Sequence, residues 1–254
     1  MTGLGAAIGF LTRIPVGASS GDSRRLARGV PWFSVVGALV GAIVAAVFAG
    51  AGTVLPAFVA ASLAVGTGLL VTGAFHEDGL GDTADALVGG WTREERLRIL
   101  RDPRLGTFGV CAVVVSLLLR TSAVASMAPW DAAAALVAAH ALARVASIGL
   151  ISFLPAASDE GLGAGYAAAV RTRHVLLGAL GGLLIAGSVL GIFLVPSALA
   201  AVFGASVMGL LAKRRIGGLT GDILGAAEQT AETLVLLLAA SAATNGWASV
   251  AWWR

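Results

Sequence analysis

The sequence predicts an all-α fold: a polytopic membrane helix bundle of about seven transmembrane helices with cytoplasmic active-site loops, forming a single integral membrane domain over residues 1–254. Of the 254 residues, 57% are hydrophobic and only 12% are charged, whereas about 25% are charged in a typical soluble domain. Nearly uncharged segments of roughly 20 residues recur, which is the length that crosses the hydrocarbon core of a bilayer. Most of the chain is therefore expected to lie within the membrane.

Seven apolar segments are expected to cross the bilayer. Their approximate bounds are 33–54, 56–74, 107–127, 132–154, 174–194, 196–212 and 231–251. Leu4–Leu11 is also apolar but short, which favours an interfacial helix. No basic region or cleavage site suggests a removable signal peptide. Between the second and third spans, Thr92 and Glu95 form a capping-box pattern that predicts a short amphipathic helix at about 93–101. This helix could serve either packing and lipid contact or substrate binding.

The basic residues, sixteen of them arginine and one lysine, follow the positive-inside rule. With the N-terminus in the cytoplasm, fourteen fall in cytoplasmic segments: Arg13, Arg24, Arg25, Arg28, Arg93, Arg96, Arg98, Arg101, Arg104, Arg171, Arg173, Lys213, Arg214 and Arg215. The acids, except Asp131, lie in or beside the same segments. Acids do not obey this rule, so their position favours a reaction centre that faces the cytoplasm.

Composition also limits the partners. The pI near 10 would suggest nucleic acid in a soluble chain, but here the positive-inside rule explains the arginines, and no nucleic-acid partner is expected. The single cysteine, Cys111, excludes an intramolecular disulfide. Glycine pairs at small-xxx-small spacing are expected to allow close helix approach, and such faces could also form a homo-oligomer. These pairs are Gly37/Gly41, Gly178/Gly182 and Gly187/Gly191.

An acidic stretch follows the second apolar segment and places four of the chain's fourteen acids within nine residues. Asp78, Asp82 and Asp85 fall at i, i+4 and i+7, which puts them on one face of a helix. Like charges in this arrangement repel, and a divalent cation held by oxygen ligands is the usual remedy. The alternative is a solvated acidic face, but such faces are normally interleaved with basic residues, and the next one is Arg93.

Two further segments are expected on the same side of the membrane, residues 101–109 and 217–229. They combine carboxylates, arginines and glycines, whose backbone N–H groups can approach an anion. This combination suits phosphoryl transfer, in which catalysis consists mostly of positioning and charge neutralisation. Carboxylates would hold Mg²⁺, Mg²⁺ would bind a diphosphate, and arginine would bind the remaining oxygens.

The three segments resemble motifs of the cobalamin synthase family. The family pattern H-x-D-G-L-x-D-x-x-D is matched by His76, Asp78, Gly79, Leu80, Asp82 and Asp85. The pattern D-x-R-x-G-T-x-G is matched by Asp102, Arg104, Gly106, Thr107 and Gly109. The pattern G-G-x-T-G-D-x-L-G-A is matched by Gly217, Gly218, Thr220, Gly221, Asp222, Leu224, Gly225 and Ala226. Segments Phe10–Val16, Ala143–Arg144 and Glu160–Gly163 also resemble that family.

The resemblance implies a reaction and a location. In that family the adenosylcobinamide phosphate moiety is transferred from adenosylcobinamide-GDP to α-ribazole or α-ribazole 5′-phosphate. GMP is released, Mg²⁺ is the cofactor, and the step completes the nucleotide loop of cobalamin. The expected partners are these substrates and the lipid bilayer. The expected location is the bacterial inner (cytoplasmic) membrane, with the active site facing the cytoplasm.

Candidate roles follow for individual residues. Four acids are expected to bind the metal: Asp78, Asp82, Asp85 and Asp102. Three residues are expected to be catalytic: His76, Asp222 and Arg104. Five are expected to bind substrate: Arg144, Thr107, Gly218, Thr220 and Gly221. Simpler structural roles remain open: an interfacial histidine for His76, a local ion pair for Asp102 with Arg104, and a helix N-cap for Thr220 or Asp222.

Two other functions compete with this interpretation. Membrane phosphotransferases of the CDP-alcohol type carry the pattern D-G-x-x-A-R, but here Asp82 stands where the alanine–arginine pair should begin. A transporter would place polar residues at mid-bilayer in several spans. Only Arg120, His140 and Arg144 are expected to lie deep, which favours an enzyme.

Overall fold

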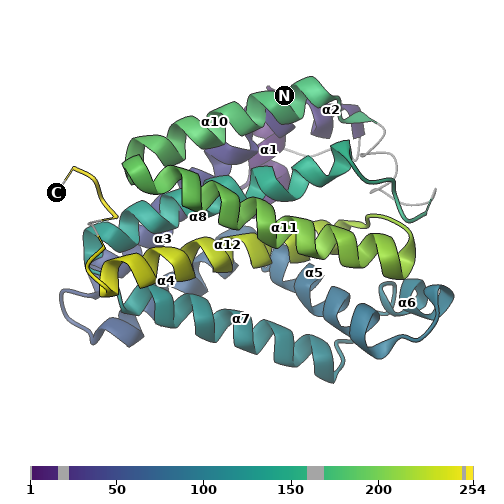
Figure 1. The fold of residues 1–254 in the computed structure, drawn as a ribbon, viewed down its shortest axis with the longest axis horizontal. Helices are drawn as coiled ribbons and strands as arrows, with labels where there is room; N and C mark the ends of the chain where they lie inside the picture. The colour runs from purple at the N-terminus through teal and green to yellow at the C-terminus, as the bar shows by residue number, and fades with distance from the viewer. Residues whose placement is uncertain (1, 17–22, 159–168, 248–249, 254) are drawn as a thin grey trace.

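The fold is a bundle of helices (Figure 1), seen in a computed structural model that describes residues 2–16, 23–158, 169–247 and 250–253. Within these ranges the only β-type pairing is an isolated parallel bridge between Ala156 and Leu219. The prediction of an all-α membrane bundle is confirmed. The segment Glu160–Gly163, which resembles the family, lies outside the described residues.

The helices follow one another along the chain with short connections. They are α1 (Gly3–Leu11), α2 (Ser23–Ala27), α3 (Phe33–Ala51), α4 (Ala57–Thr72), α5 (Phe75–Ala84), α6 (Arg93–Ile99), α7 (Thr107–Ala125), α8 (Pro129–Gly149), α10 (Thr172–Leu190), α11 (Leu194–Ile216) and α12 (Gly221–Thr244). Short turns are η1 (Val30–Trp32), η3 (Leu150–Ser152), η4 (Gly191–Phe193) and a π-helical turn, η2 (Asp85–Gly89). Helices α8 and α12 lie at the centre (Figure 1): α8 packs against α3, α10 and α11, and α12 packs against α5, α7, α8 and α11.

Among the described residues, five helical runs are long and apolar enough to cross a membrane, and the pair α4 and α5, bent by 93°, makes up to six. The run Thr172–Ile216 contains both α10 and α11. The chain reverses between these two helices at Gly191, whose φ is +53° (Figure 1). The count of seven crossings stays a prediction.

The predicted bounds of the last span were wrong. We expected residues 231–251, whereas α12 runs from Gly221 to Thr244. The predicted span began at residue 231, between Glu228 and Glu232, because a carboxylate in hydrocarbon is costly unless it is paired. Both side chains are paired inside the bundle, as described below, so the helix extends through them.

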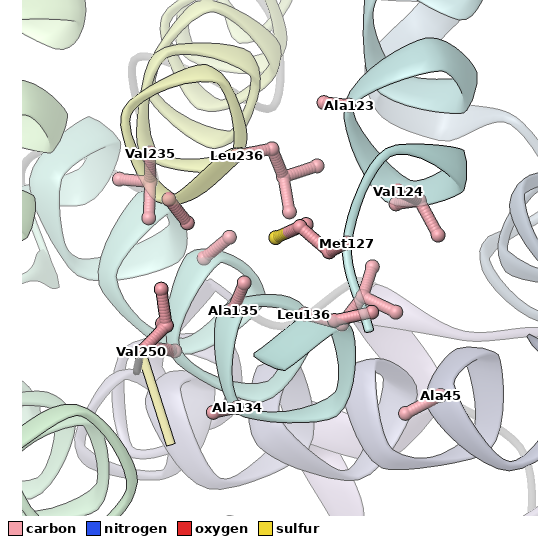
Figure 2. Packing of buried hydrophobic residues seen from close by; sticks show 14 of the residues in the cluster. Ala45, Ala123, Val124, Met127, Ala134, Ala135, Leu136, Val235, Leu236 and Val250 are labelled. Carbon is pink, nitrogen blue, oxygen red and sulfur yellow. The ribbon is translucent and has the colours of Figure 1, made fainter. Parts of the chain in front are cut away.

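Small residues fill the interior of the bundle and large ones cover its outside. The main core cluster is rich in alanine, and in Figure 2 the side chain of Met127 lies between Leu136 of α8 and Leu236 of α12. On α10, Leu176, Leu180 and Leu184 are 63%, 55% and 65% exposed. This arrangement is typical of a protein whose outer solvent is lipid, where close backbone contact, not apolar burial, holds helices together.

Two of the three glycine pairs lie at close helix contacts, as predicted. A Cβ atom added at Gly41 of α3 would lie 2.5 Å from the Leu136 carbonyl oxygen and 2.8 Å from Cα of Val137, both in α8. On α10, a Cβ at Gly182 would lie 3.1 Å from Cγ2 of Val145. The third pair differs, because Gly191 ends α10 with a φ of +53° and forms the turn to the next helix.

Gly41→Ala is expected to lower the free energy of unfolding by about 1–3 kcal/mol, because the methyl group would force α3 away from α8. Gly50→Ala, in the same helix, is the matched control, since a Cβ there meets no atom within 4 Å. Unfolding by a denaturing detergent in mixed micelles, followed by circular dichroism, measures both variants. Equal stabilities would show that the α3–α8 contact tolerates a methyl group.

The predicted amphipathic surface helix is α6, and its N-terminus shows the expected cap. Thr92 Oγ1 accepts a hydrogen bond from the Glu95 N–H at 3.2 Å, and Glu95 Oε2 accepts one from the Trp91 N–H at 2.9 Å. Arg93 donates hydrogen bonds to the carbonyl oxygens of Ile216 at 2.9 Å and Ala157 at 2.8 Å. Helix α6 therefore packs on the C-terminal end of α11, where a cation also compensates the free carbonyl groups.

Candidate active site

A break between α4 and α5 positions the acidic motif. Gly73 and Ala74 have φ angles of +71° and +56°, and α5 leaves the direction of α4 at 93°. A non-glycine residue with positive φ is uncommon. The backbone of Arg13 holds the last turn of α4, because its N–H donates to the Val71 carbonyl oxygen at 2.7 Å. The break turns α5 away from the direction of α4, and α5 packs against α12 (Figure 1).

Helices α5 and α12 meet at glycine residues. A Cβ atom added at Gly79 would lie 2.8 Å from the carbonyl oxygen of Asp222 and 3.3 Å from Cα of Gly225. This approach brings Asp222, in the first turn of α12, close enough to Asp78 and Asp82 of α5 for their charges to act on one another. The ionised groups that act on Asp82 are Asp78, Asp222 and Asp85, which are all acids. Asp78 is exposed and the other two members of this carboxylate cluster are partly exposed, so their oxygens are accessible to a cation.

Asp85 was predicted on the same face as Asp78 and Asp82, and its charge does act on Asp82, but its carboxylate is buried and hydrogen-bonded to α7. The α-helix ends at Ala84, and Asp85 begins the π-helical turn η2, which re-aims its buried side chain. The carboxylate accepts hydrogen bonds from the N–H groups of Gly106 at 2.6 Å and Gly109 at 2.9 Å. These N–H groups belong to the start of α7 and have no partner within the helix. Since both carboxylate oxygens of Asp85 accept hydrogen bonds, Asp78 and Asp82 are better candidates for magnesium ligands than Asp85.

The predicted clamp of Asp102 and Arg104 forms a local ion pair. The Nε and Nη2 atoms of Arg104 donate to the two carboxylate oxygens of Asp102 at 2.9 and 2.7 Å. These hydrogen bonds lower the pKa of Asp102 to about 2. The side chain of Arg104 is 85% exposed. Thr107 is also exposed, as the first residue of α7. In this structure, the pair is thus a surface feature of the loop before α7.

The glycine-rich segment before α12 is built mainly for helix termination and packing. Gly217 ends α11 with φ of +89°, and Gly218 is buried against Pro155 and Ala156. Thr220 is the N-cap of α12, because its Oγ1 accepts a hydrogen bond from the Ile223 N–H at 3.3 Å. The hydroxyl of Thr220 also donates to Asp222 Oδ2 at 3.3 Å. Gly221 differs from the other glycines here, because a Cβ added to it would meet no atom within 4 Å.

A buried charge cluster links four helices next to the carboxylate cluster, and sequence reasoning missed the role of its three glutamates. Its members come from α5, α7, α8 and α12 and are each at most 6% exposed: His76, Glu77, Arg120, His140, Arg144, Glu228 and Glu232. The expectation that only Arg120, His140 and Arg144 lie deep was therefore wrong. Two sequence signals could have found the others, namely the spacing i, i+4 of Glu228 and Glu232 and the need of two intramembrane arginines for partners.

Arg144, which we expected to bind substrate, lies at one end of this buried charge cluster. Its Nη1 donates to Glu228 Oε1 at 2.6 Å and to the carbonyl oxygen of His140 at 2.9 Å. His76 Nδ1 lies 3.8 Å from the other carboxylate oxygen of Glu228. The guanidinium therefore neutralises a glutamate and fixes α8 against α12.

Arg120 lies at the other end and bridges two glutamates. Its Nη2 donates to Glu77 Oε1 and its Nη1 to Glu232 Oε1, both at 3.0 Å. His140 Nδ1 lies 2.8 Å from Glu232 Oε2. A cavity of about 10 Å³ lies among these groups, with room for about one water molecule. His140, Glu228 and Glu232 are also close enough to share an ion, but two guanidinium groups already neutralise the glutamates.

Known proteins match the chain over nearly its full length. The model of the family described as cobalamin-5-phosphate synthase matches residues 3–240. A protein of Bradyrhizobium diazoefficiens is 44% identical over 244 residues, which cover 92% of both chains. Proteins of Azorhizobium caulinodans and Ralstonia pickettii are 42% and 41% identical, each covering 92% of this chain and 93% of the relative. The three relatives are named adenosylcobinamide-GDP ribazoletransferase.

No solved structure matches the chain. The family match nevertheless includes the acidic motif of α5, the start of α7 and the first turns of α12, which are the segments that form the carboxylate cluster and its supports. On this match and these identities, the chain belongs to the cobalamin-5-phosphate synthase family.

Proposed function

We propose that the chain transfers the adenosylcobinamide phosphate moiety from adenosylcobinamide-GDP to α-ribazole or its 5′-phosphate and releases GMP. The family match and the names of the relatives support this reaction. The main structural support is the carboxylate cluster of Asp78, Asp82 and Asp222. The charged groups that act on Asp82 are all acids, and no basic residue is among them. A diphosphate substrate that arrives with a divalent cation would compensate this charge.

Asp78 and Asp82 would hold Mg²⁺ in this proposal, and the charge of Asp222 acts on Asp82 from the start of α12. Their partly exposed carboxylate oxygens are the hard ligands that Mg²⁺ prefers. Mg²⁺ would neutralise the charge that develops on the phosphate oxygens during transfer.

The reaction joins a ribose hydroxyl of the acceptor to the phosphorus that carries cobinamide. The bond from this phosphorus to the oxygen of GMP breaks, and the bonding electrons leave with GMP. We assign the proton of the attacking hydroxyl to Asp222, which lies at the N-terminus of α12. The N–H groups of that first turn also favour a negatively charged group nearby. His76 lies on the opposite side of α5 from solvent and is paired toward Glu228, which suits a positioning role.

The test is GMP release by the detergent-purified protein given adenosylcobinamide-GDP and α-ribazole, with Mg²⁺ or with EDTA. We expect equal amounts of GMP and of a cobalamin product with Mg²⁺, and neither with EDTA. A parallel assay with α-ribazole 5′-phosphate identifies the preferred acceptor. Turnover that persists in EDTA would overturn the magnesium assignment, and no turnover by folded protein would overturn the reaction.

We also propose that the carboxylate cluster faces the cytoplasm of a bacterial inner membrane. The basic ends of α6 and α11 lie together at the same end of the bundle as the start of α12 (Figure 1). This end carries the positive charge that cytoplasmic segments favour.

Cysteine labelling tests this orientation in a Cys111→Ser background. Glu94→Cys on α6 should react with a membrane-impermeant maleimide in inverted vesicles only, because its position is expected in the cytoplasm. Val54→Cys is the matched control, since Val54 is 81% exposed in the connection between α3 and α4 and should react from outside. The opposite labelling pattern would show that the carboxylate cluster faces away from the cytoplasm.

A further inference from the structure

An apolar cavity lies beside the start of α12 and borders the buried charge cluster at His76 and Arg144. Its volume is about 210 Å³, and it is enclosed by the N-terminal helices together with α5, α8 and α12. Three aromatic rings form one wall. The centroid of Phe10 lies 5.8 Å from that of Phe33, with the rings stacked, and 5.4 Å from that of Phe75, with the rings edge to face. We call this space the aromatic pocket.

The aromatic pocket reaches the carboxylate cluster at one end. Gly221 and Gly225 of α12 line it, as does His76 of α5. Gly221 directly precedes Asp222, and Gly225 touches the turn of α5 that contains Gly79, with Cα of Gly79 3.4 Å from a Cβ added at Gly225. A molecule whose ring fills the pocket would therefore emerge at the first turn of α12, next to the carboxylates.

We propose that the aromatic pocket binds the base of the acceptor nucleoside, a flat and largely apolar benzimidazole-type ring. This inference rests on the proposed function and adds the place where the acceptor is held. Bound there, the ring would direct its ribose toward Asp222, which is the geometry that the transfer requires.

The size of the pocket selects among the molecules of this reaction. A cavity of roughly 150 Å³ already admits benzene, so about 210 Å³ is suitable for a bicyclic ring. The corrin macrocycle of the donor is several times larger than benzene and does not fit. The donor's guanine is also bicyclic, so size alone does not separate it from the acceptor base.

The chemistry of the wall separates these two bases. Guanine carries hydrogen-bonding groups along most of its edge, and burying them without partners is unfavourable. The wall offers three polar side chains, which are fewer than the edge of guanine needs: Arg144, whose Nη1 binds Glu228 while its Nε has no partner among the described residues, Ser147, whose hydroxyl donates to the Arg144 carbonyl oxygen at 3.2 Å, and His76. A benzimidazole riboside exposes a single ring nitrogen, and its remaining surface suits phenylalanine, leucine and isoleucine side chains.

The first experiment measures equilibrium binding of α-ribazole to the full-length protein in detergent, without donor. Leu224→Trp should weaken binding at least tenfold, because the larger side chain would occupy the pocket that Leu224 lines. Leu237→Trp is the matched control, because Leu237 is also a half-buried leucine of α12 but packs against the main core and does not line the pocket. Removal of both ring methyl groups from the ligand should weaken wild-type binding roughly tenfold.

Unchanged binding by Leu224→Trp, or no binding by wild type, overturns the proposal. The first result would also be expected if a lipid chain occupies the pocket. Should Leu224→Trp fail to fold, Ile148→Ala enlarges the same wall. It should shift the preference toward the riboside of a tricyclic base, and an unchanged preference would overturn the proposal. Because donor is absent, pocket-dependent binding without any GMP release in the full assay would reject the proposed function alone.

Discussion

Asp82→Asn is expected to lower the Mg²⁺-dependent rate of GMP release by at least about 100-fold, because a metal that stabilises the transferring phosphate is worth several kcal/mol. Asparagine keeps the shape of the side chain but removes its charge. Asp82 lies among Asp78, Asp85 and Asp222, so the substitution also relieves repulsion between like charges. The variant should therefore be at least as stable as wild type in EDTA.

Thermal unfolding with and without Mg²⁺ separates loss of the metal from loss of the fold. Mg²⁺ should raise the unfolding temperature of wild type, because a ligand that binds the native state stabilises it, and it should raise that of Asp82→Asn much less. Glu94→Gln on the exposed face of α6 is the control that removes one acid elsewhere. A full rate in Asp82→Asn, or an equal response of both proteins to Mg²⁺, would exclude Asp82 as a ligand.

Arg144→Met is expected to destabilise the protein by about 3–5 kcal/mol, the usual cost of removing one partner from a buried ion pair. The substitution leaves Glu228 without the guanidinium that binds it at 2.6 Å. Methionine fills a similar volume, so the loss of charge and hydrogen bonds dominates. Unfolding by a denaturing detergent measures the effect, and Arg214→Met, at the exposed end of α11, should change stability little.

A second substitution tests whether charge explains the loss. Glu228→Gln combined with Arg144→Met should recover part of the lost stability, because the double variant no longer buries an unpaired carboxylate. A double variant that is less stable than Arg144→Met would indicate that other partners hold Glu228. The candidates are Gln229, whose Nε2 donates to Glu228 Oε2 at 3.0 Å, and His76, 3.8 Å away.

The sequence predicted the apolar helices well because their signal is local. The third predicted span, 107–127, corresponds to α7 at Thr107–Ala125, and the cap of α6 at Thr92 lies where the spacing of Thr92 and Glu95 indicates. The pairing of Glu228 and Glu232 with arginines of α7 and α8 is not local. Without that information, the two carboxylates indicated that the last span starts at 231, ten residues after Gly221, where α12 begins.

The candidate site shows the same division. Its residue types were predicted, and Asp78, Asp82 and Asp222 lie together, but their mutual placement depends on the contact of Gly79 with Asp222 across two helices. Gly106 and Gly109 were interpreted as part of an anion-binding segment, whereas they bring two N–H groups to the carboxylate of Asp85. The spacing of a motif does not reveal which of its members contact one another.

The buried charge cluster has a consequence for biogenesis. Arg120 follows its partner Glu77 along the chain, whereas Arg144 is synthesised 84 residues before Glu228, the partner that neutralises it. A charged residue alone at the centre of a membrane helix costs roughly 2.5–3.5 kcal/mol even at the insertion machinery. While the ribosome extends the chain, α8 is therefore expected to remain beside the translocon. We expect the arrival of α12 to allow α8 to enter the lipid, so that the last helix to be made completes the insertion of an earlier one.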